Sequence, residues 1–397
     1  MIDSGHPPVA IAIGYSVRAL IEACWYAGLE CVAVDHFGDS DTRGYANDRW
    51  IELRLTERGL LLNETRHAIH ATATASFRAG KKVVFVLAGG MENLGGVVEE
   101  LREIAPVLGP TEHQRLALRD IAFLDDVARG AGLRTPQLRY DKVSDGGWLW
   151  KPSKSAGGLR IVRSGCAVCD LESGYWQQYI GGEQIGIFCV IGPSGCEILG
   201  ATSSFDAADW PGPSEFIYRG SIGPIALTAE CRSRIECMCQ KIRDSIGFCG
   251  CLQFDFIRDP CGGLWLLECN PRWTAGMEIC LFAGGVNPVR GLFAINNLSV
   301  SNRTVDQGGV FECYAKAIVY ATQPIIVTGE LIAELNRIEG VADRPFAPQL
   351  IECGHPVATV RAGLKCGDAN LIFEESRTLL LDELWRRAER VKSIIGD

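Results

Sequence analysis

The sequence lacks any segment that predicts contact with a membrane. Residues 1–8 contain neither the basic stretch nor the apolar stretch of a secretory signal. No apolar run approaches the ~20 residues needed to span a bilayer, and the longest, residues 82–90, has the length of a buried strand. We therefore expect a cytoplasmic protein without membrane partners.

The sequence also lacks an excess of positive charge. It has 39 Lys and Arg against 48 Asp and Glu, which gives a net charge of −9 and a pI near 5.3. A nucleic-acid binder needs a dense basic face, so this balance argues against a nucleic-acid partner. A local basic pocket for a single nucleotide remains compatible with an acidic average.

Several familiar catalytic and nucleotide-binding motifs are missing. No Gly-rich segment ends in the Gly-Lys-Ser/Thr of a Walker P-loop. The turn after the first strand has Gly14, Ser16 and Ala19 in place of three glycines, which disfavours a nicotinamide-binding unit. No Gly-x-Ser-x-Gly elbow occurs, and the 6 His residues are scattered without metal-binding spacing.

Cysteine, in contrast, is abundant, with 17 residues. In a chain without a secretory signal, this favours reduced, buried thiols. Three close pairs invite a zinc interpretation: Cys166/Cys169, Cys237/Cys239 and Cys249/Cys251. The first has zinc-knuckle spacing, but no second pair with a nearby His lies at zinc-finger distance, so buried thiols are favoured over structural zinc.

The chain of 397 residues is long enough for two or three domains. Apolar strands at 9–13, 29–35 and 83–88, separated by helical patterns, predict a small doubly wound parallel-sheet domain over 1–110. A helical stretch over 111–136 and antiparallel-looking strands from 148 to 203 follow. We expect these strands to form a mobile cover over a site.

The remaining sequence predicts a core and a closing unit. A helix over 230–246 precedes a hairpin over 250–257 and 264–269. A β-rich stretch over ~305–365 and a final helix over 370–395 complete the chain. The predicted domains are thus 1–110, 111–304 with a lid at about 140–203, and 305–397.

The hairpin carries the most informative polar residues. Glu268 and Asn270 are two apart on one strand, so they share a face, and Asp255 lies on the partner strand. Two carboxylates and an amide oxygen suit Mg²⁺ or Mn²⁺, which phosphate oxygens would complete. The alternative is a sheet face with solvated carboxylates, and the spacing leaves both interpretations open.

Two further segments suggest a nucleotide. Lys151 ends an aromatic strand and precedes a Gly/Ser loop over 153–158, which suits phosphate binding. Residues 177–183 read Gln-Gln-Tyr-Ile-Gly-Gly-Glu, which suits contacts to adenine and ribose. Taken alone, each segment is better explained by an ordinary turn or surface hairpin.

In this order, the three segments resemble the ATP-grasp superfamily, and the terminal Glu-x-Asn-Pro-Arg is the most specific part. Residues 14–18 and 34–43 are similar to a branch of predicted ATP-dependent carboligases found with one-carbon cofactor genes, which includes relatives of tyramine–glutamate ligase. Residues 342–345 and 354–360 look like the C-terminal unit of biotin-carboxylase-like members. The resemblance covers most of the chain. It implies an ATP-grasp fold of mixed α/β and α+β class, with a leading domain, an ATP-binding lid and core, and a β-rich C-terminal unit.

The resemblance implies a role for each matching residue. Lys151 would hold the α- and β-phosphates, and Arg272 would stabilise an acyl phosphate as a catalytic residue with Lys151. The other implied ligands are, for the γ-phosphate, Ser155, Gly157 and Gly158; for adenine, Gln178 and Tyr179; for ribose, Glu183; and for the metal, Asp255, Glu268 and Asn270. Arg119 is the best substitute for an upstream phosphate-binding Lys that the sequence lacks. Glu92, after the strand at 83–88, is placed either to face substrate or to cap a helix.

The implied activity is ligation of a small-molecule carboxylate to an amine through an acyl phosphate, with ATP and Mg²⁺, in one-carbon cofactor biosynthesis (methanofuran or tetrahydromethanopterin type). A homodimer is compatible with it. A bicarbonate-using carboxylase-like enzyme and a non-catalytic nucleotide sensor are the alternatives. Substrate pockets in this architecture are built by loops, so the donor and the acceptor are not readable from the sequence.

Overall fold

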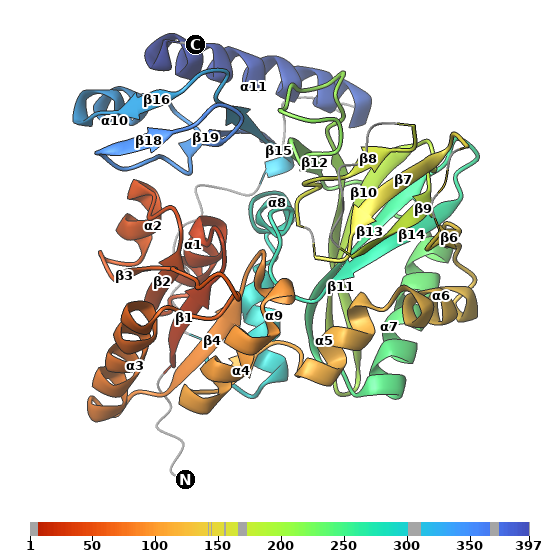
Figure 1. Ribbon diagram of the computed structural model, residues 1–397, viewed down its shortest axis with the longest axis horizontal. Coiled ribbons are helices and arrows are strands. Elements are labelled where there is room, and N and C mark those ends of the chain that lie inside the picture. Colours follow the sequence, from red (N-terminus) through yellow and green to blue (C-terminus); the bar gives the residue numbers. More distant parts are fainter. Residues whose placement is uncertain are drawn as a thin grey trace.

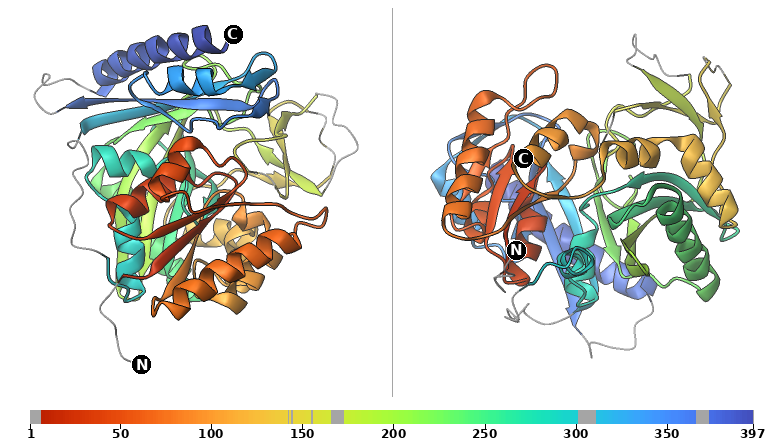
Figure 2. Two further views of the ribbon diagram at one scale, coloured as in Figure 1. Left: turned by 90° about the vertical axis from the view of Figure 1, so that its left-hand side faces the viewer. Right: turned by 90° about the horizontal axis from the view of Figure 1, so that it is seen from below.

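The computed structural model describes residues 7–141, 143, 145–154, 156–165, 173–300, 311–365 and 373–396. It combines a parallel sheet, a large antiparallel sheet and two small antiparallel sheets, with helices on the faces of the two larger sheets (Figures 1 and 2). The predicted mixture of α/β and α+β structure is confirmed.

The N-terminal unit is built on a five-stranded parallel sheet in the order β3-β2-β1-β4-β5. Alternate residues of β1 enter different cores: Ala10 and Ala12 pack toward α1, and Ile11 and Ile13 pack toward α3 and α4. Both faces are therefore covered, as in a doubly wound domain. The elements are β1 (Val9–Ile13), α1 (Arg18–Tyr26), β2 (Cys31–Asp35), α2 (Ser40–Tyr45), β3 (Trp50–Glu52), α3 (Asn63–Arg78), β4 (Val83–Leu87), η1 (Met91–Asn93), α4 (Gly95–Ile104) and β5 (Val107–Leu108).

Two short helices, α5 (Glu112–Arg119) and α6 (Ile121–Gly130), lead out of this unit. The sequence predicted one helical stretch here. The chain breaks at Asp120 because its carboxylate accepts a hydrogen bond from the backbone N–H of Ala122 at 2.9 Å and caps α6.

A small four-stranded sheet follows, in the order β6-β9-β7-β8. Its strands are β6 (Leu138–Arg139), β7 (Trp148–Pro152), β8 (Val162–Arg163) and β9 (Gly174–Gln178). Trp148 and Trp176 fill its own small core with Val143. The sheet ends at Gln178, whereas the sequence extended the lid to about residue 203.

The large sheet has eight strands in the order β14-β13-β10-β11-β12-β15-β19-β17. β10 and β11, which we expected at the end of the lid, instead pair with each other and with the hairpin strand β13 in this sheet. Two strands from the C-terminal stretch, β15 and β19, continue the same sheet. The strands are β10 (Glu183–Gly192), β11 (Gly195–Ser204), β12 (Gly220–Gly223), β13 (Gly250–Arg258), β14 (Leu264–Asn270), β15 (Phe311–Tyr320), β17 (Val341–Ala342) and β19 (Pro356–Lys365).

Helices cover both faces of the large sheet. α7 (Ala229–Ile246) packs on β10 and β11, and α11 (Phe373–Ile395) packs on β15 and β19. α8 (Met277–Ala283) and α9 (Pro288–Ile295), cyan in Figure 1, lie between the large sheet and α1. The remaining elements are β16 (Ile325–Val327), α10 (Gly329–Leu335) and β18 (Gln349–Ile351).

Among the described helices, no single one is both long and apolar enough to cross a membrane. Only α8 and α9 taken together reach that length and apolar composition, and the pair is sharply bent.

Candidate active site

The hairpin β13–β14 brings the predicted metal ligands together. Asp255 pairs directly with Glu268 across the two strands. The Asn270 side chain donates to Asp255 Oδ2 at 2.8 Å and to Glu268 Oε1 at 3.2 Å. In the described part of the chain, no group of three His, Cys, Asp or Glu side chains is placed to hold a metal ion alone. A cation bound here would therefore also need oxygen ligands from outside the protein.

The two carboxylates repel each other in a buried environment. Burial and then the charge of Glu268 hold the pKa of Asp255 well above its usual range. Burial also acts to raise the pKa of Glu268, but the positive charges of Lys151 and Arg119 outweigh burial and lower it. The two carboxylates thus disfavour each other's ionisation, and a divalent cation between them would stabilise both in the charged form.

Lys151 and Arg119 supply those positive charges from different elements. Lys151, on β7, is buried, and no hydrogen bond from its ammonium is found among the described residues. Burial lowers the pKa of Lys151, and the charges of Glu268 and Asp255 oppose that shift. Arg119, at the end of α5, donates to the Ser153 carbonyl at 3.3 Å. The positive charges of Lys151 and Arg119 therefore lie close to the hairpin carboxylates. The roles of these residues remain predictions.

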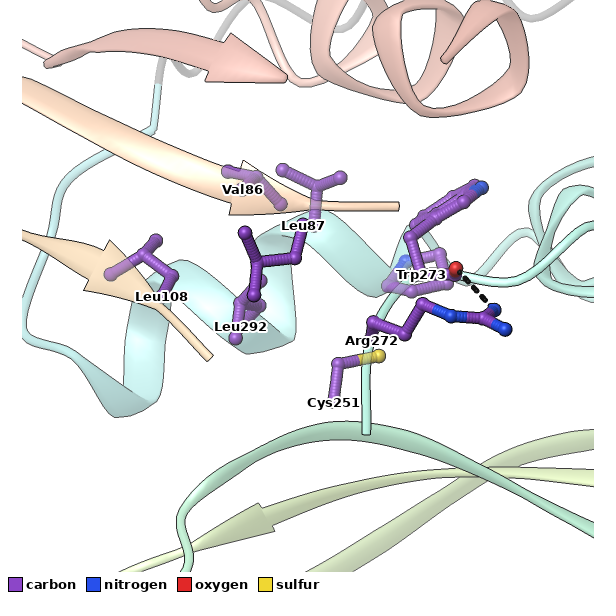
Figure 3. Close-up of a pocket in the computed structure, with 9 residues that line it drawn as sticks. Val86, Leu87, Leu108, Cys251, Arg272, Trp273 and Leu292 are labelled. Carbon is purple, nitrogen blue, oxygen red and sulfur yellow. Dashed lines mark hydrogen bonds between the residues drawn. The ribbon is translucent and has the colours of Figure 1, made fainter. Parts of the chain in front are cut away.

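Arg272 joins the β13–β14 hairpin to the parallel sheet. Its guanidinium donates to both Glu92 oxygens, with Nε–Oε2 at 2.6 Å and Nη2–Oε1 at 2.5 Å, and to Asn270 Oδ1 at 3.1 Å. Glu92 lies just after β4, in η1, and its side chain is 1% exposed. Burial acts to raise the pKa of Glu92, but Arg272 lowers it. Figure 3 shows Arg272 extending past Trp273, at the edge of the packing between β4 and α9.

The sequence left the role of Glu92 open, and the structure gives it an ion pair with Arg272. The pair could not be recognised from sequence because its partners are 180 residues apart. The turn before Glu92 also approaches Arg272 closely. A Cβ on Gly89 would lie 4.0 Å from Arg272 Nη1.

The Gly/Ser loop after β7 is held against a segment that the sequence analysis did not single out. Gly157 and Gly158 both have positive φ, at 63° and 81°. Tyr218 N donates to the Gly157 carbonyl at 3.0 Å, and a Cβ on Gly158 would lie 1.7 Å from the Phe216 carbonyl oxygen. Only glycine permits this contact. The third predicted loop residue, Ser155, lies outside the described residues.

The predicted adenine and ribose contacts lie where β9 leads into β10. The backbone N–H groups of Gln178 and Tyr179 already donate to Gln137 and Gly147, each at 2.8 Å. Glu183 accepts from Arg258 Nε at 3.1 Å. The backbone N–H groups of Gln178 and Tyr179 are therefore engaged within the protein, and the contacts of these residues with a nucleotide remain predictions.

Tyr218 is affected by charges on two sides. Its hydroxyl and Ser221 Oγ lie 2.8 Å apart. Burial, and then the charges of Glu278 and Asp255, raise the pKa of Tyr218. Tyr218 is therefore influenced by a carboxylate of the hairpin and by Glu278 of a buried charge network. Nothing in the sequence around Tyr218 marks it, because the contact depends on the order of strands in the large sheet.

The network itself joins three parts of the fold. Arg18 on α1 donates to Glu278 on α8 at 2.5 Å and 2.9 Å and to Asp343 at 2.9 Å. Lys316 on β15 donates to Glu278 at 2.5 Å, and Arg361 on β19 donates to Glu278 at 3.0 Å. The N-terminal unit, α8 and the C-terminal strands are thus tied together by buried ion pairs.

Comparison with known proteins identifies the fold. No family model and no curated protein sequence matches the chain. Solved structures do match: a carboxyaminoimidazole ribonucleotide synthase from Aspergillus clavatus, complexed with ATP, aligns with a TM-score of 0.66 at 10% identity over 97% of this chain and 99% of that chain. The chain has the ATP-grasp fold.

Two other ATP-grasp structures align over most of their length. An L-amino acid ligase from Bacillus licheniformis has a TM-score of 0.63 at 16% identity, covering 96% of this chain and 98% of that one. The biotin carboxylase domain of the Hydrogenobacter thermophilus 2-oxoglutarate carboxylase, in complex with MgADP and bicarbonate, has a TM-score of 0.60 at 14% identity, covering 90% and 86%. The fold that the sequence resemblance implies is confirmed, while membership of the superfamily and of its carboligase branch remains a prediction.

Proposed function

We propose that the chain is an ATP-dependent carboxylate–amine ligase that uses Mg²⁺-ATP to activate a carboxylate as an acyl phosphate. One observation carries the proposal: Asp255, Glu268 and Asn270 form a single cluster, with the charge of Lys151 close to both carboxylates and that of Arg119 close to Glu268. The fold agrees with it, because structurally similar proteins include an L-amino acid ligase and complexes with ATP or MgADP.

The residues fit a divalent cation. The buried Asp255 and half-buried Glu268 carboxylates lie side by side, and the pKa of Asp255 is raised by burial and by its neighbour, so the pair is unfavourable without added positive charge. Their oxygens are donors that Mg²⁺ prefers over nitrogen or sulfur, whereas Asn270 turns its Nδ2 toward them and its Oδ1 toward Arg272. When bound, Mg²⁺ or Mn²⁺ would neutralise charge on the β- and γ-phosphates.

The other residues would position the triphosphate and the reacting carboxylate. Lys151 and Arg119 would hold phosphate oxygens, with backbone N–H groups of the Gly/Ser loop as further donors. Arg272 is fixed by Glu92 and Asn270 and would neutralise charge on the acyl phosphate.

The reaction needs no covalent intermediate on the protein. A substrate carboxylate oxygen attacks the γ-phosphorus and ADP leaves, which gives an acyl phosphate. The amine nitrogen then attacks the carbonyl carbon, inorganic phosphate leaves, and the nitrogen loses a proton to give the amide. The chain would contribute orientation, charge neutralisation and exclusion of water under the four-stranded sheet.

The pathway follows only from the sequence resemblance. We propose a role in one-carbon cofactor biosynthesis on that basis. A bicarbonate-using enzyme is the second candidate, because a biotin carboxylase domain is among the similar structures. ADP release that is stimulated by bicarbonate, and not by a carboxylate together with an amine, would favour this second candidate.

The first experiment is a screen for ADP release with Mg²⁺-ATP, small carboxylates, amino acids and amines. Glu268→Gln should abolish Mg²⁺-dependent ADP release and leave the fold intact, because it removes one ligand charge from a repelling pair. Glu197→Gln, at an exposed position on strand β11 of the same sheet, is the matched control and should behave as wild type. Undiminished turnover in Glu268→Gln would refute the site assignment.

A further inference from the structure

The loop between β11 and β12, residues 205–219, is held in shape by a buried arginine. Arg219 is 4% exposed, and its guanidinium donates to three backbone carbonyls of the same loop. The acceptors are Glu215 O at 2.9 Å, Ile217 O at 2.9 Å and Ser214 O at 2.6 Å. Hydrogen bonds from a charged donor are stronger than those between neutral groups. The backbone at the tip of the loop is therefore fixed, although the side chain of Glu215 is exposed.

The first half of the 205–219 loop is anchored to the C-terminal unit. Trp210 Nε1 donates to the Ile318 carbonyl of β15 at 2.8 Å, and the Trp210 ring packs on Trp385 of α11 with ring centres 4.6 Å apart. Arg377 of α11 also forms an ion pair with Asp209. Because these anchors lie on β15 and α11, the tip of the loop is presented from the C-terminal unit.

The tip of the loop contacts the four-stranded sheet through backbone at the Gly/Ser loop. Tyr218 N donates to the Gly157 carbonyl at 3.0 Å, and the Phe216 carbonyl lies against Gly158. These two contacts depend on the shape of both loops and not on charge. They place the anchored loop beside the residues assigned to the γ-phosphate.

An ion pair adds a second contact between the same two parts. The guanidinium of Arg163, on β8, donates to both carboxylate oxygens of Glu215, with Nε–Oε1 at 2.9 Å, Nε–Oε2 at 3.0 Å and Nη2–Oε1 at 2.5 Å. It also lies over the rings of Tyr179 and Phe216, 4.3 Å and 5.5 Å from their centres. The hydrogen bond from Arg163 lowers the pKa of Glu215, so this carboxylate is charged at neutral pH.

This ion pair differs from those around Glu278 because it is open to solvent. The side chains of Arg163 and Glu215 are 41% and 48% exposed. An exposed ion pair contributes little and is weakened further by salt. The contact can therefore be released at small cost, while Arg219 and the C-terminal unit keep the 205–219 loop in place.

We propose that the 205–219 loop fastens the four-stranded sheet over bound nucleotide, with Arg163 and Glu215 as the releasable contact that sets how fast the nucleotide leaves. The inference rests on the proposed function, because the sheet and its Gly/Ser loop carry the residues assigned to ATP. Opening of a cover limits turnover in many enzymes, so the ion pair makes the exchange of ADP for ATP sensitive to salt. Arg163 and Glu215 are positioning residues, since neither is assigned a contact with nucleotide or substrate.

The first test measures dissociation of fluorescently labelled MgADP by stopped-flow, with an excess of unlabelled MgADP, at about 50 mM and about 500 mM salt. Glu215→Gln keeps the shape and removes the charge, so MgADP should leave about threefold faster at low salt. Dissociation from wild-type protein should accelerate with salt, and Glu215→Gln should lose most of that acceleration. Arg139→Gln is the control, because its partner Asp145 lies in the turn before β7 and not in the 205–219 loop. It should behave as wild type.

A double variant tests whether the two side chains act as a pair. Arg163→Gln/Glu215→Gln should release MgADP at the rate of Arg163→Gln alone, because Glu215 has no partner to hold once Arg163 is gone. Rate increases that multiply in the double variant would show that the two residues act separately, which would overturn the proposed contact.

Hydrogen exchange without nucleotide separates this inference from the proposed function. The backbone N–H of Tyr218 bonds across the junction to Gly157, whereas that of Phe205 donates to the Gly220 carbonyl at 3.0 Å at the base of the loop. In Glu215→Gln, the Tyr218 amide should exchange about threefold faster and the Phe205 amide should not change, which also shows that the variant is folded.

The two failures are distinguishable. Wild-type exchange of the Tyr218 amide in Glu215→Gln, or wild-type dissociation of MgADP from that variant, would overturn the role of the ion pair. Absence of MgADP binding by the wild-type protein would instead refute the proposed function, on which the nucleotide part of the inference rests.

Discussion

Arg272 acts through geometry as well as charge. One guanidinium contacts Glu92 through two oxygens, Asn270 through its amide oxygen and the Trp273 carbonyl at 3.1 Å. A planar fork can satisfy these partners and still present a face to a phosphate, whereas a lysine ammonium is a point charge on a flexible stem. A substitution of Arg272 by lysine can therefore separate the effect of charge from that of orientation.

Arg272→Lys is expected to lower kcat for ADP formation by about 10²- to 10³-fold. The KM for ATP should change little, because the triphosphate is assigned to Lys151 and Arg119. Steady-state kinetics on the substrates found in the ADP screen measures both quantities. Arg134→Lys, at a largely exposed arginine paired with Asp259, is the control and should have wild-type kinetics. A wild-type kcat in Arg272→Lys would show that a positive charge alone is sufficient.

At the residue scale, the sequence predicted what local geometry determines. Asp255, Glu268 and Asn270 were recognisable because a short turn sets the hairpin register and alternation sets the face. Glu92 and Tyr218 depend on contacts between segments far apart in the chain, which periodicity does not encode.

At the scale of elements, hydrophobic patterns gave the strands and helices, but not their sheet partners. The run now assigned to β10 and β11 reads as a hairpin, and a hairpin is equally compatible with the lid and with the large sheet. The pairing of β10 with β13 places this hairpin in the large sheet, and it joins segments about 70 residues apart. The break between α5 and α6 was missed because a single cap at Asp120 ended the helical pattern.

The glycine loop offers a prediction at this scale, because its two glycines differ in a useful way. Gly157 and Gly158 share positive φ, but only Gly158 would bring a Cβ against backbone, at the Phe216 carbonyl oxygen. Gly158→Ala should therefore displace the loop and raise the KM for ATP by about tenfold or more, equivalent to ~1.4 kcal/mol. Gly157→Ala carries the φ strain without the clash and should have a clearly smaller effect.

ATP titrations of initial rate on both variants measure this difference. The control is the unfolding temperature, which should be the same in the two variants. A match would show that the difference in KM comes from the loop and not from a loss of overall stability. Equal KM values in Gly158→Ala and Gly157→Ala would mean that contact with Phe216 does not position the loop over ATP.

At the scale of the whole molecule, the buried ion pairs around Glu278 join the N-terminal unit to the large sheet. Glu278 has no exposed surface and accepts from Arg18, Lys316 and Arg361, which come from α1, β15 and β19. Removing one partner from such a network leaves uncompensated charges in the interior, which typically costs about 3–5 kcal/mol. The network is therefore expected to determine how firmly these units are held together.

Glu278→Gln should lower the free energy of unfolding at pH 7 by about 3 kcal/mol. Burial acts to raise the pKa of Glu278, but Arg18 and then Lys316 hold it well below the ordinary value of 4.5. A lowered folded pKa means that the carboxylate stabilises the protein above about pH 4.5, and that this stabilisation is lost as the pH falls toward the lowered value. The stability gap between wild type and variant should therefore narrow at acid pH.

Urea denaturation of both proteins at pH 7 and pH 4 measures that gap. Glu383→Gln, at a partly exposed helical ion pair with Arg387, is the comparison and should cost at most about 0.5 kcal/mol at either pH. A gap that stays constant from pH 7 to pH 4 would show that the Glu278 charge does not stabilise the fold. In that case the packing of α8 alone would hold the N-terminal unit against the large sheet.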